Sequence, residues 1–157
     1  MPHLPIIAAP DAASATSPSA PDDSPSSTHG TRSDVRDEDL HDLLVNFYAA
    51  VALEPLLAPY FAEVDMAEHI PRIADFWSTL LFHSGRYSGN AFRPHMSMPG
   101  LDAPHFARWV ATMEATVDAR FAGPVAENLK ALAHRIAYSM QLRLGVSPFA
   151  DFRPARN

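Results

Sequence analysis

The chain has 157 residues, 47% of them hydrophobic and 19% charged, which is a composition typical of one globular domain. It contains no cysteine, and this excludes disulfides, zinc ribbons, iron–sulfur clusters and any thiolate-ligated metal. The formal net charge of -6 argues against a nucleic-acid or anionic-membrane partner, because such partners are bound by basic faces. Any transition metal must then be held by His, Met, Tyr or carboxylate groups, with imidazole as the leading candidate.

Nothing in the sequence indicates a membrane segment or a targeting segment. No run approaches the roughly 18 to 20 uninterrupted apolar residues that are needed to cross a bilayer. The N-terminus has no basic region followed by an apolar block, the pattern of a secretory signal. We therefore expect no membrane span and a cytoplasmic location.

The composition divides the chain into three parts. Residues 1–36 are built from Ala, Pro, Ser, Thr and Asp, with hardly a large apolar side chain after Ile7. Such a segment cannot bury enough surface to offset its chain entropy, so it is predicted to be a disordered tail. Residues 37–146 form the predicted folded domain, and residues 147–157, with two further prolines, are expected to be a loosely ordered end.

Four stretches of the folded part have apolar residues at helical spacing, and no stretch shows the alternation of a strand. Asp37 and Asp39 are N-cap candidates before the first helix, which should stop before Pro55 or Pro59. The four apolar stripes are Leu40, Leu43, Leu44, Phe47 and Val51; Ile70, Ile73, Phe76, Trp77, Leu80 and Leu81; Phe106, Trp109, Val110, Met113, Val117 and Phe121; and Val125, Leu129, Leu132, Ile136, Met140 and Leu144.

Proline and glycine positions refine these boundaries. Pro71 disfavours helical torsions at Ile70, so the second helix is expected to begin at Ile70 or Pro71. Asp102 and Pro104 suit the cap and first turn of the third helix, and the fourth should start near Pro124. Residues 85–100 hold three glycines and two prolines, which leaves room for at most one helical turn. The expected architecture is an all-α domain of four main helices plus short ones.

Aromatic and histidine side chains recur along the domain in an order that suggests a haem pocket. A polar donor lies on the first helix, a histidine opens the second, and another histidine sits in the loop between Gly and Pro residues. Five-coordinate haem iron needs one neutral imidazole, an apolar slot for the macrocycle and a few donors on the ligand-binding face. The positions are Phe47-Tyr48, His69, Phe76-Trp77, Tyr87, His95 and Trp109.

These positions fall within five short motifs that together resemble one protein family. The motifs are Phe47-Tyr48, His69 through Phe76-Trp77, Gly85-Arg86-Tyr87-Ser88-Gly89, His95-Met96-Ser97-Met98-Pro99 and Phe106-Ala107-Arg108-Trp109. In this order and at these intervals they resemble a truncated haemoglobin of group III, over roughly residues 40 to 145. The resemblance implies a truncated globin-like two-over-two helical sandwich that holds haem b, iron protoporphyrin IX.

The resemblance also implies roles for individual residues. His95 would be the proximal iron ligand, and Tyr48, His69 and Trp109 would line the distal side. Arg72 could reach a haem propionate, since guanidinium–carboxylate pairs are strong and bidentate. The apolar wall would be formed by Phe47, Phe76, Trp77, Phe92 and Met98.

The function expected from this pocket is binding of a diatomic gas at the iron: dioxygen, nitric oxide or carbon monoxide. Donors such as Tyr48 and Trp109 would hold bound oxygen firmly, which favours redox chemistry or detoxification of nitric oxide or peroxide over bulk oxygen transport. Nitric oxide dioxygenase or peroxidase-like turnover would require an external reductase. Two alternatives remain: a non-enzymatic globin that stores or senses oxygen, nitric oxide or sulfide, and a haem-free helical interaction domain.

Overall fold

The computed structural model describes residues 32–146, and within them the chain is helical apart from its loops. A short 3-10 turn precedes the first helix, and a second 3-10 turn carries His95 between the second and third of the four main helices. The elements are η1 (Asp37–Asp39), α1 (Leu40–Val51), α2 (Ala58–Phe61), α3 (Met66–Phe82), η2 (Arg93–Ser97), α4 (Ala103–Asp118) and α5 (Pro124–Leu144). The all-α prediction is confirmed.

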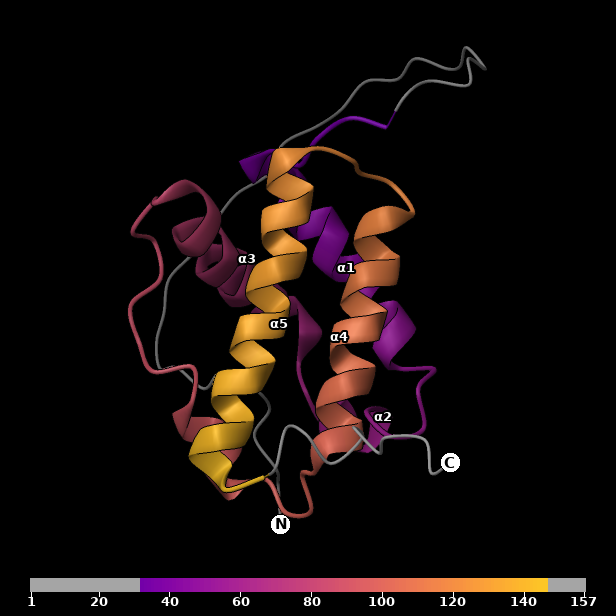
Figure 1. Cartoon of the computed structure of the whole chain (residues 1–157), viewed down its shortest axis with the longest axis vertical. Helices are drawn as coiled ribbons and strands as arrows, with labels where there is room; N and C mark the ends of the chain where they lie inside the picture. The colour runs from indigo at the N-terminus through magenta and orange to yellow at the C-terminus, as the bar shows by residue number, and fades with distance from the viewer. Residues whose placement is uncertain (1–31, 147–157) are drawn as a thin grey trace, which may run out of the picture.

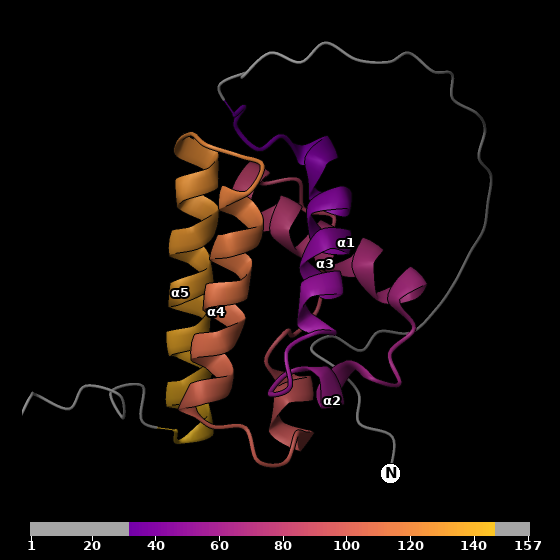
Figure 2. The same cartoon turned by 90° about the vertical axis from the view of Figure 1, so that its right-hand side faces the viewer.

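The helices form two crossed pairs. Figure 1 shows α4 and α5 side by side, and the turned view in Figure 2 shows α1 on the side of α4 that faces away from α5, with α3 packed across α1. The pairs in closest contact are α4 with α5, α1 with α3, and α1 with α4. This arrangement buries the predicted stripe of α1 completely, with Leu44 and Val51 at 0% exposure. The two pairs therefore enclose a main core, and a second, smaller apolar cluster contains Phe106, Val110 and Ala137.

The boundaries of α1, α4 and α5 agree with the sequence analysis. Asp102 caps α4 by accepting a hydrogen bond from the backbone N–H of Ala103 at 2.8 Å, with Pro104 in the first turn. Pro124 occupies the first turn of α5, which ends at Gly145 in the left-handed conformation, φ 72°. The start of α4 and both ends of α5 thus lie at residues whose backbone preferences fit those positions.

The predicted start of the second helix is wrong. α3 begins at Met66, because Asp65 caps it by accepting a hydrogen bond from the N–H of Ala67 at 3.0 Å. Pro71 lies inside the helix, where the cost of one missing N–H is offset by tertiary packing of the helix. As a result His69 is the fourth residue of α3, and its side chain is buried at 4% exposure.

Residues 33–36, which the sequence analysis assigned to the tail, pack on the domain. Val35 is 3% exposed and belongs to the core, and Ser33 pairs with Phe121 in an isolated parallel bridge. The carboxylate of Asp34 accepts hydrogen bonds from the N–H groups of Val125 and Ala126 at the start of α5, at 2.9 and 2.8 Å. The remainder of that tail, residues 1–31, and the C-terminal end, residues 147–157, lie outside the described part of the chain.

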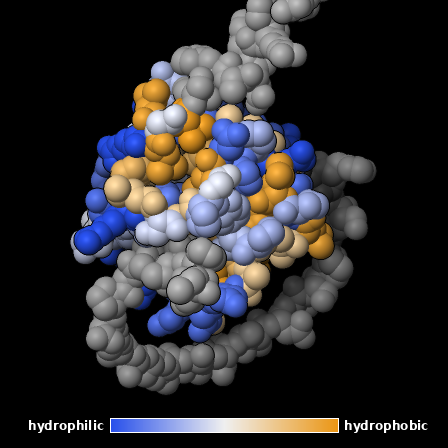
Figure 3. Space-filling view, turned by 90° about the horizontal axis from the view of Figure 1, so that it is seen from below, coloured by the Kyte–Doolittle hydropathy of each residue, from blue (hydrophilic) through white to orange (hydrophobic). Residues whose placement is uncertain are grey.

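The surface carries some apolar side chains. The most exposed are Leu53 at 84% and Met96 at 66%. On the end of the molecule drawn in Figure 3, apolar residues lie in small groups between polar ones. No helix among the described residues is long and apolar enough to cross a membrane.

Candidate functional site

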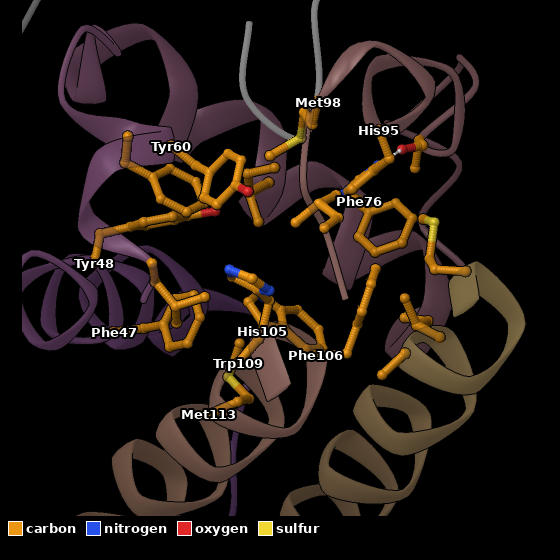
Figure 4. A pocket seen from close by; sticks show the side chains of 18 of the residues that line it. Phe47, Tyr48, Tyr60, Phe76, His95, Met98, His105, Phe106, Trp109 and Met113 are labelled. Carbon is orange, nitrogen blue, oxygen red and sulfur yellow. Dashed lines mark hydrogen bonds between the residues drawn. The ribbon is translucent and has the colours of Figure 1, made fainter. Parts of the chain in front are cut away.

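A deep cavity lies between the two helix pairs, at the side of the domain that carries η2 (Figure 4). It holds about 780 Å³ of empty space counted out to its open mouth. Its lining includes Phe47, Tyr48, Leu57, Tyr60, Phe61, Ile73, Phe76, Trp77, Ala91, His95, Met98, Leu101, His105, Phe106, Trp109, Met113, Ile136, Ala137 and Met140.

His95 enters the cavity from η2. It is 5% exposed, and its Nδ1 lies 2.9 Å from the backbone carbonyl of Ala91. A carbonyl oxygen can only accept, so Nδ1 carries the proton and Nε2 presents a lone pair. Burial lowers the pKa of His95, against the opposing effect of its backbone hydrogen bonds to Ala91 and Phe92, which favours this neutral form.

Tyr48 enters from the opposite side, on α1 (Figure 4). It is 5% exposed, and burial raises the pKa of its hydroxyl, which therefore stays protonated at neutral pH. Its oxygen lies 2.9 Å from Nε2 of His69 on α3, and the two rings meet edge to face at 5.1 Å. The cavity thus has an unprotonated imidazole nitrogen on one side and a phenol on the other.

His69 supports Tyr48 from behind and is not among the residues that line the cavity. Burial, assisted by the nearby charge of Arg72, lowers the pKa of His69 to about 4, so the imidazole is neutral at pH 7. The ring of Phe61 lies 6.3 Å away on its other flank. The Tyr48–His69 pair is consequently a hydrogen bond between neutral groups in apolar surroundings.

Aromatic rings form much of the remaining wall. Trp109 on α4 meets Phe47 edge to face, with ring centroids 6.1 Å apart. Phe76 packs in the same way on Trp77, at 5.7 Å, and on Tyr87, at 5.3 Å. Because edge-to-face contacts fix ring orientation, the wall is a rigid apolar slot.

The structure brings together seven of the ten residues predicted for the site. Those that line the cavity are Phe47, Tyr48, Phe76, Trp77, His95, Met98 and Trp109. The other three lie close by: His69 behind Tyr48, Arg72 half-buried on α3, and Phe92 beneath the guanidinium of Arg143, 5.2 Å from its ring centroid.

Several lining residues are not among those that the sequence analysis assigns to the site. Ile73, Phe106 and Met113 lie one turn from predicted wall residues, so helical spacing was a usable signal for them. Tyr60 and His105 had no such signal. They meet only because α2 lies against the start of α4 in three dimensions, with their rings 5.6 Å apart.

The described residues contain no group of three or more His, Asp or Glu side chains that could hold a metal ion. A single buried imidazole in an apolar slot does not bind a bare cation well. It is, however, the one axial ligand that a protein supplies to five-coordinate haem iron. The tautomer of His95 and the apolar lining of the cavity both fit haem.

Comparisons with known proteins agree with this geometry. No protein-family model matches the chain. A similar curated protein is the group 3 truncated hemoglobin ctb of Campylobacter jejuni, 24% identical over 90 residues that span 54% of this chain and 71% of that protein. A similar solved structure is a group III truncated hemoglobin from Campylobacter jejuni, with a TM-score of 0.64 and 24% identity over 70% of this chain and 91% of the other.

These findings place the fold in the class of truncated globins. The resemblance to group III truncated haemoglobins drawn from the sequence motifs is confirmed, since both comparisons lead to proteins of that group.

Proposed function

We propose that the cavity binds haem b, with His95 as the axial ligand and a diatomic ligand held on the opposite face beside Tyr48 and Trp109. The observation that carries the proposal is the buried His95 imidazole, whose Nδ1–H donates to Ala91 while Nε2 points a lone pair into an apolar cavity. Haem would supply an iron that binds the gas and exchanges electrons with it.

On the proximal side, the chain orients and tunes the imidazole. The Ala91 carbonyl fixes the His95 ring and raises the basicity of Nε2 by accepting the proton on Nδ1. Burial keeps protons from competing for Nε2, because it lowers the pKa of the imidazole. His95 is therefore ready to ligate without deprotonation at neutral pH.

On the distal side, Tyr48 and Trp109 supply hydrogen-bond donors. The indole N–H of Trp109 can only donate. The hydroxyl of Tyr48 can donate into the cavity when His69 donates its Nε2–H to the Tyr48 oxygen, an arrangement that the 2.9 Å contact between neutral groups allows. His69 thus acts through Tyr48 as a positioning residue.

Arg72 is the proposed partner of a haem carboxylate. It is half-buried on α3 and makes no ion pair within residues 32–146. It lies near enough to the cavity wall for its charge to lower the pKa of His69 and to oppose the burial that raises the pKa of Tyr87. A carboxylate there would satisfy its guanidinium.

The donor pair favours redox chemistry on the bound gas over oxygen transport. Hydrogen bonds to charged groups contribute about 1.5–3 kcal/mol each, so two of them would slow ligand release by roughly 100-fold or more. Detoxification of nitric oxide or peroxide with electrons from a separate reductase is the activity we propose. A storage or sensing globin would instead keep a stable oxygen adduct and consume no nitric oxide.

The test is haem titration of the purified protein, followed by absorption spectra of the ferric, reduced and carbon monoxide forms. The expected result is stoichiometric uptake with an intense Soret band that shifts with carbon monoxide, and a weakened or altered band in His95→Ala. The matched control is His134→Ala, because His134 is an exposed histidine of α5 that pairs with Glu114 of α4 and does not line the cavity. Absence of uptake, or equal spectra for both variants, would overturn the proposal and favour a haem-free helical domain.

A further inference from the structure

One edge of the cavity is lined by the half-buried residues Tyr60, Leu101 and His105. The hydroxyl of Tyr60 donates to the carbonyl of Pro99 at 2.7 Å, which ties α2 to the segment before α4. The Tyr60 ring stands edge to face on the imidazole of His105, at 5.6 Å. This rim is therefore held by contacts between three separate segments.

The capping box of α4 fixes the tautomer of His105. The N–H of Asp102 lies 3.1 Å from Nδ1 of His105, and the His105 backbone N–H in turn lies against the Asp102 carboxylate. A backbone N–H can only donate, so Nδ1 is the acceptor and the proton of the neutral imidazole is on Nε2. Glutamate or glutamine usually fills this position of a capping box, so histidine here places a ring where those residues place a flexible chain.

The two histidines that line the cavity thus present opposite hydrogen-bonding groups at Nε2. His95 presents a lone pair, because its Nδ1 donates to Ala91, whereas His105 presents an N–H, because its Nδ1 accepts from Asp102. Figure 4 shows the nitrogen-bearing edge of His105 directed from α4 into the cavity. Its Nε2 has no protein partner within residues 32–146, and the hydroxyl hydrogen of Tyr60 is already used by Pro99.

We propose that His105 is the hydrogen-bond donor of the cavity entrance and selects small anionic ligands, such as nitrite or azide, over neutral carbon monoxide. An anion that enters an apolar cavity loses its water shell, and a fixed N–H at the rim replaces part of that hydration. Carbon monoxide is a poor acceptor and gains nothing from it. This inference rests on the proposed haem function.

The experiment uses the haem-loaded protein. Association rates of azide and nitrite with the ferric form are compared with the rate of carbon monoxide binding to the ferrous form. His105→Phe keeps a ring of similar size and removes the donor, so both anion rates should fall about tenfold while the carbon monoxide rate stays within a factor of two. His105→Gln keeps a capping acceptor and a side-chain N–H, and should recover most of the loss.

The outcomes separate the two proposals. No haem uptake by the wild type overturns both. Haem uptake with unchanged anion rates in His105→Phe, or with an equal fall in the anion and carbon monoxide rates, overturns the role of His105 alone. If His105→Phe does not fold, long-range ¹H–¹⁵N spectra of the wild-type apo-protein decide: a proton on Nε2 of His105 supports the proposal and a proton on Nδ1 overturns it.

Discussion

Tyr48→Phe tests the buried hydrogen bond that links α1 to α3. The substitution removes one oxygen and leaves the ring, so packing against Phe47 and Phe61 is kept. The imidazole of His69, at 4% exposure, then loses its partner at 2.9 Å with no access to water. An unsatisfied buried polar group costs about 1–3 kcal/mol, so we expect the free energy of unfolding to fall by about 2 kcal/mol at pH 7.

A double variant isolates the bond from the loss of either side chain. In Tyr48→Phe with His69→Leu, both polar groups are gone and no buried nitrogen is left unpaired. Replacing both partners by apolar groups is often nearly neutral, so the double variant should be more stable than the sum of the single variants predicts, by about 1–2 kcal/mol. Urea unfolding of the apo-protein, followed by far-ultraviolet circular dichroism, measures the free energy of unfolding of each variant and hence this coupling. The variants should share one m-value, so that a shift in the midpoint reports stability alone.

Additive losses would refute the reasoning, because groups that exchange a buried hydrogen bond must be energetically coupled. A loss below about 0.5 kcal/mol in Tyr48→Phe alone would also refute it, since that is the size of a change at an unimportant surface site. In the haem-loaded protein, the same single substitution should speed dioxygen dissociation by roughly 10-fold to 100-fold. An unchanged rate would remove Tyr48 from the proposed distal site.

Three further predictions concern stability. The pKa of His69 is about 4 in the folded protein and roughly 6.5 in the unfolded chain. Between these pH values the unfolded chain binds more protons than the folded protein. The free energy of unfolding should therefore fall by up to about 3 kcal/mol as the pH drops from 6.5 to 4. The variant with Tyr48→Phe and His69→Leu should lack this slope in urea titrations across that range, and an identical slope would contradict the assignment. Asp34→Ala removes the acceptor of two backbone N–H groups at the start of α5 and should lower the free energy of unfolding by about 2 kcal/mol. Burial raises the pKa of the Asp34 carboxyl, but the hydrogen bonds from backbone N–H groups lower it overall. The loss in Asp34→Ala should therefore shrink as the pH falls below roughly 3.8, where the carboxylate becomes protonated. Gly123→Ala places a Cβ 2.5 Å from the Cγ of Asp34, so in a thermal-unfolding cycle the two substitutions should be less than additive, and full additivity would count against this contact.

The main helices were predictable because their signals are local. The stripe of α1, the Asp102 cap and the proline at the start of α5 each lie within a few residues of the boundary they set, and the structure confirms all three. The start of α3 was missed for a local reason as well. Pro71 indicates a break in the helix, but Asp65, six residues earlier, is the cap at which the helix begins.

The candidate site was only partly predictable. Aromatic residues on the buried faces of helices, such as Phe76 and Trp77, were identified because the residues that line the cavity recur at the same helical spacing as the residues that are buried in the core. The sequence motif also singled out His95. It could not indicate that the Ala91 carbonyl would orient the ring, since that contact depends on the 3-10 geometry of η2.

By itself, the sequence determined the existence of the main helices and the lack of thiol chemistry, and it predicts which histidine would be an axial ligand. The tertiary structure alone decided that His69 stands behind Tyr48 instead of lining the cavity, that Asp34 caps a helix ninety residues away, and that Tyr60 meets His105 at the rim. These contacts join segments that are far apart in the chain. Helical periodicity and capping rules cannot predict them, because both describe only residues that are close in sequence. Contacts between distant segments are fixed by how the two helix pairs cross, which is a property of the packed core as a whole.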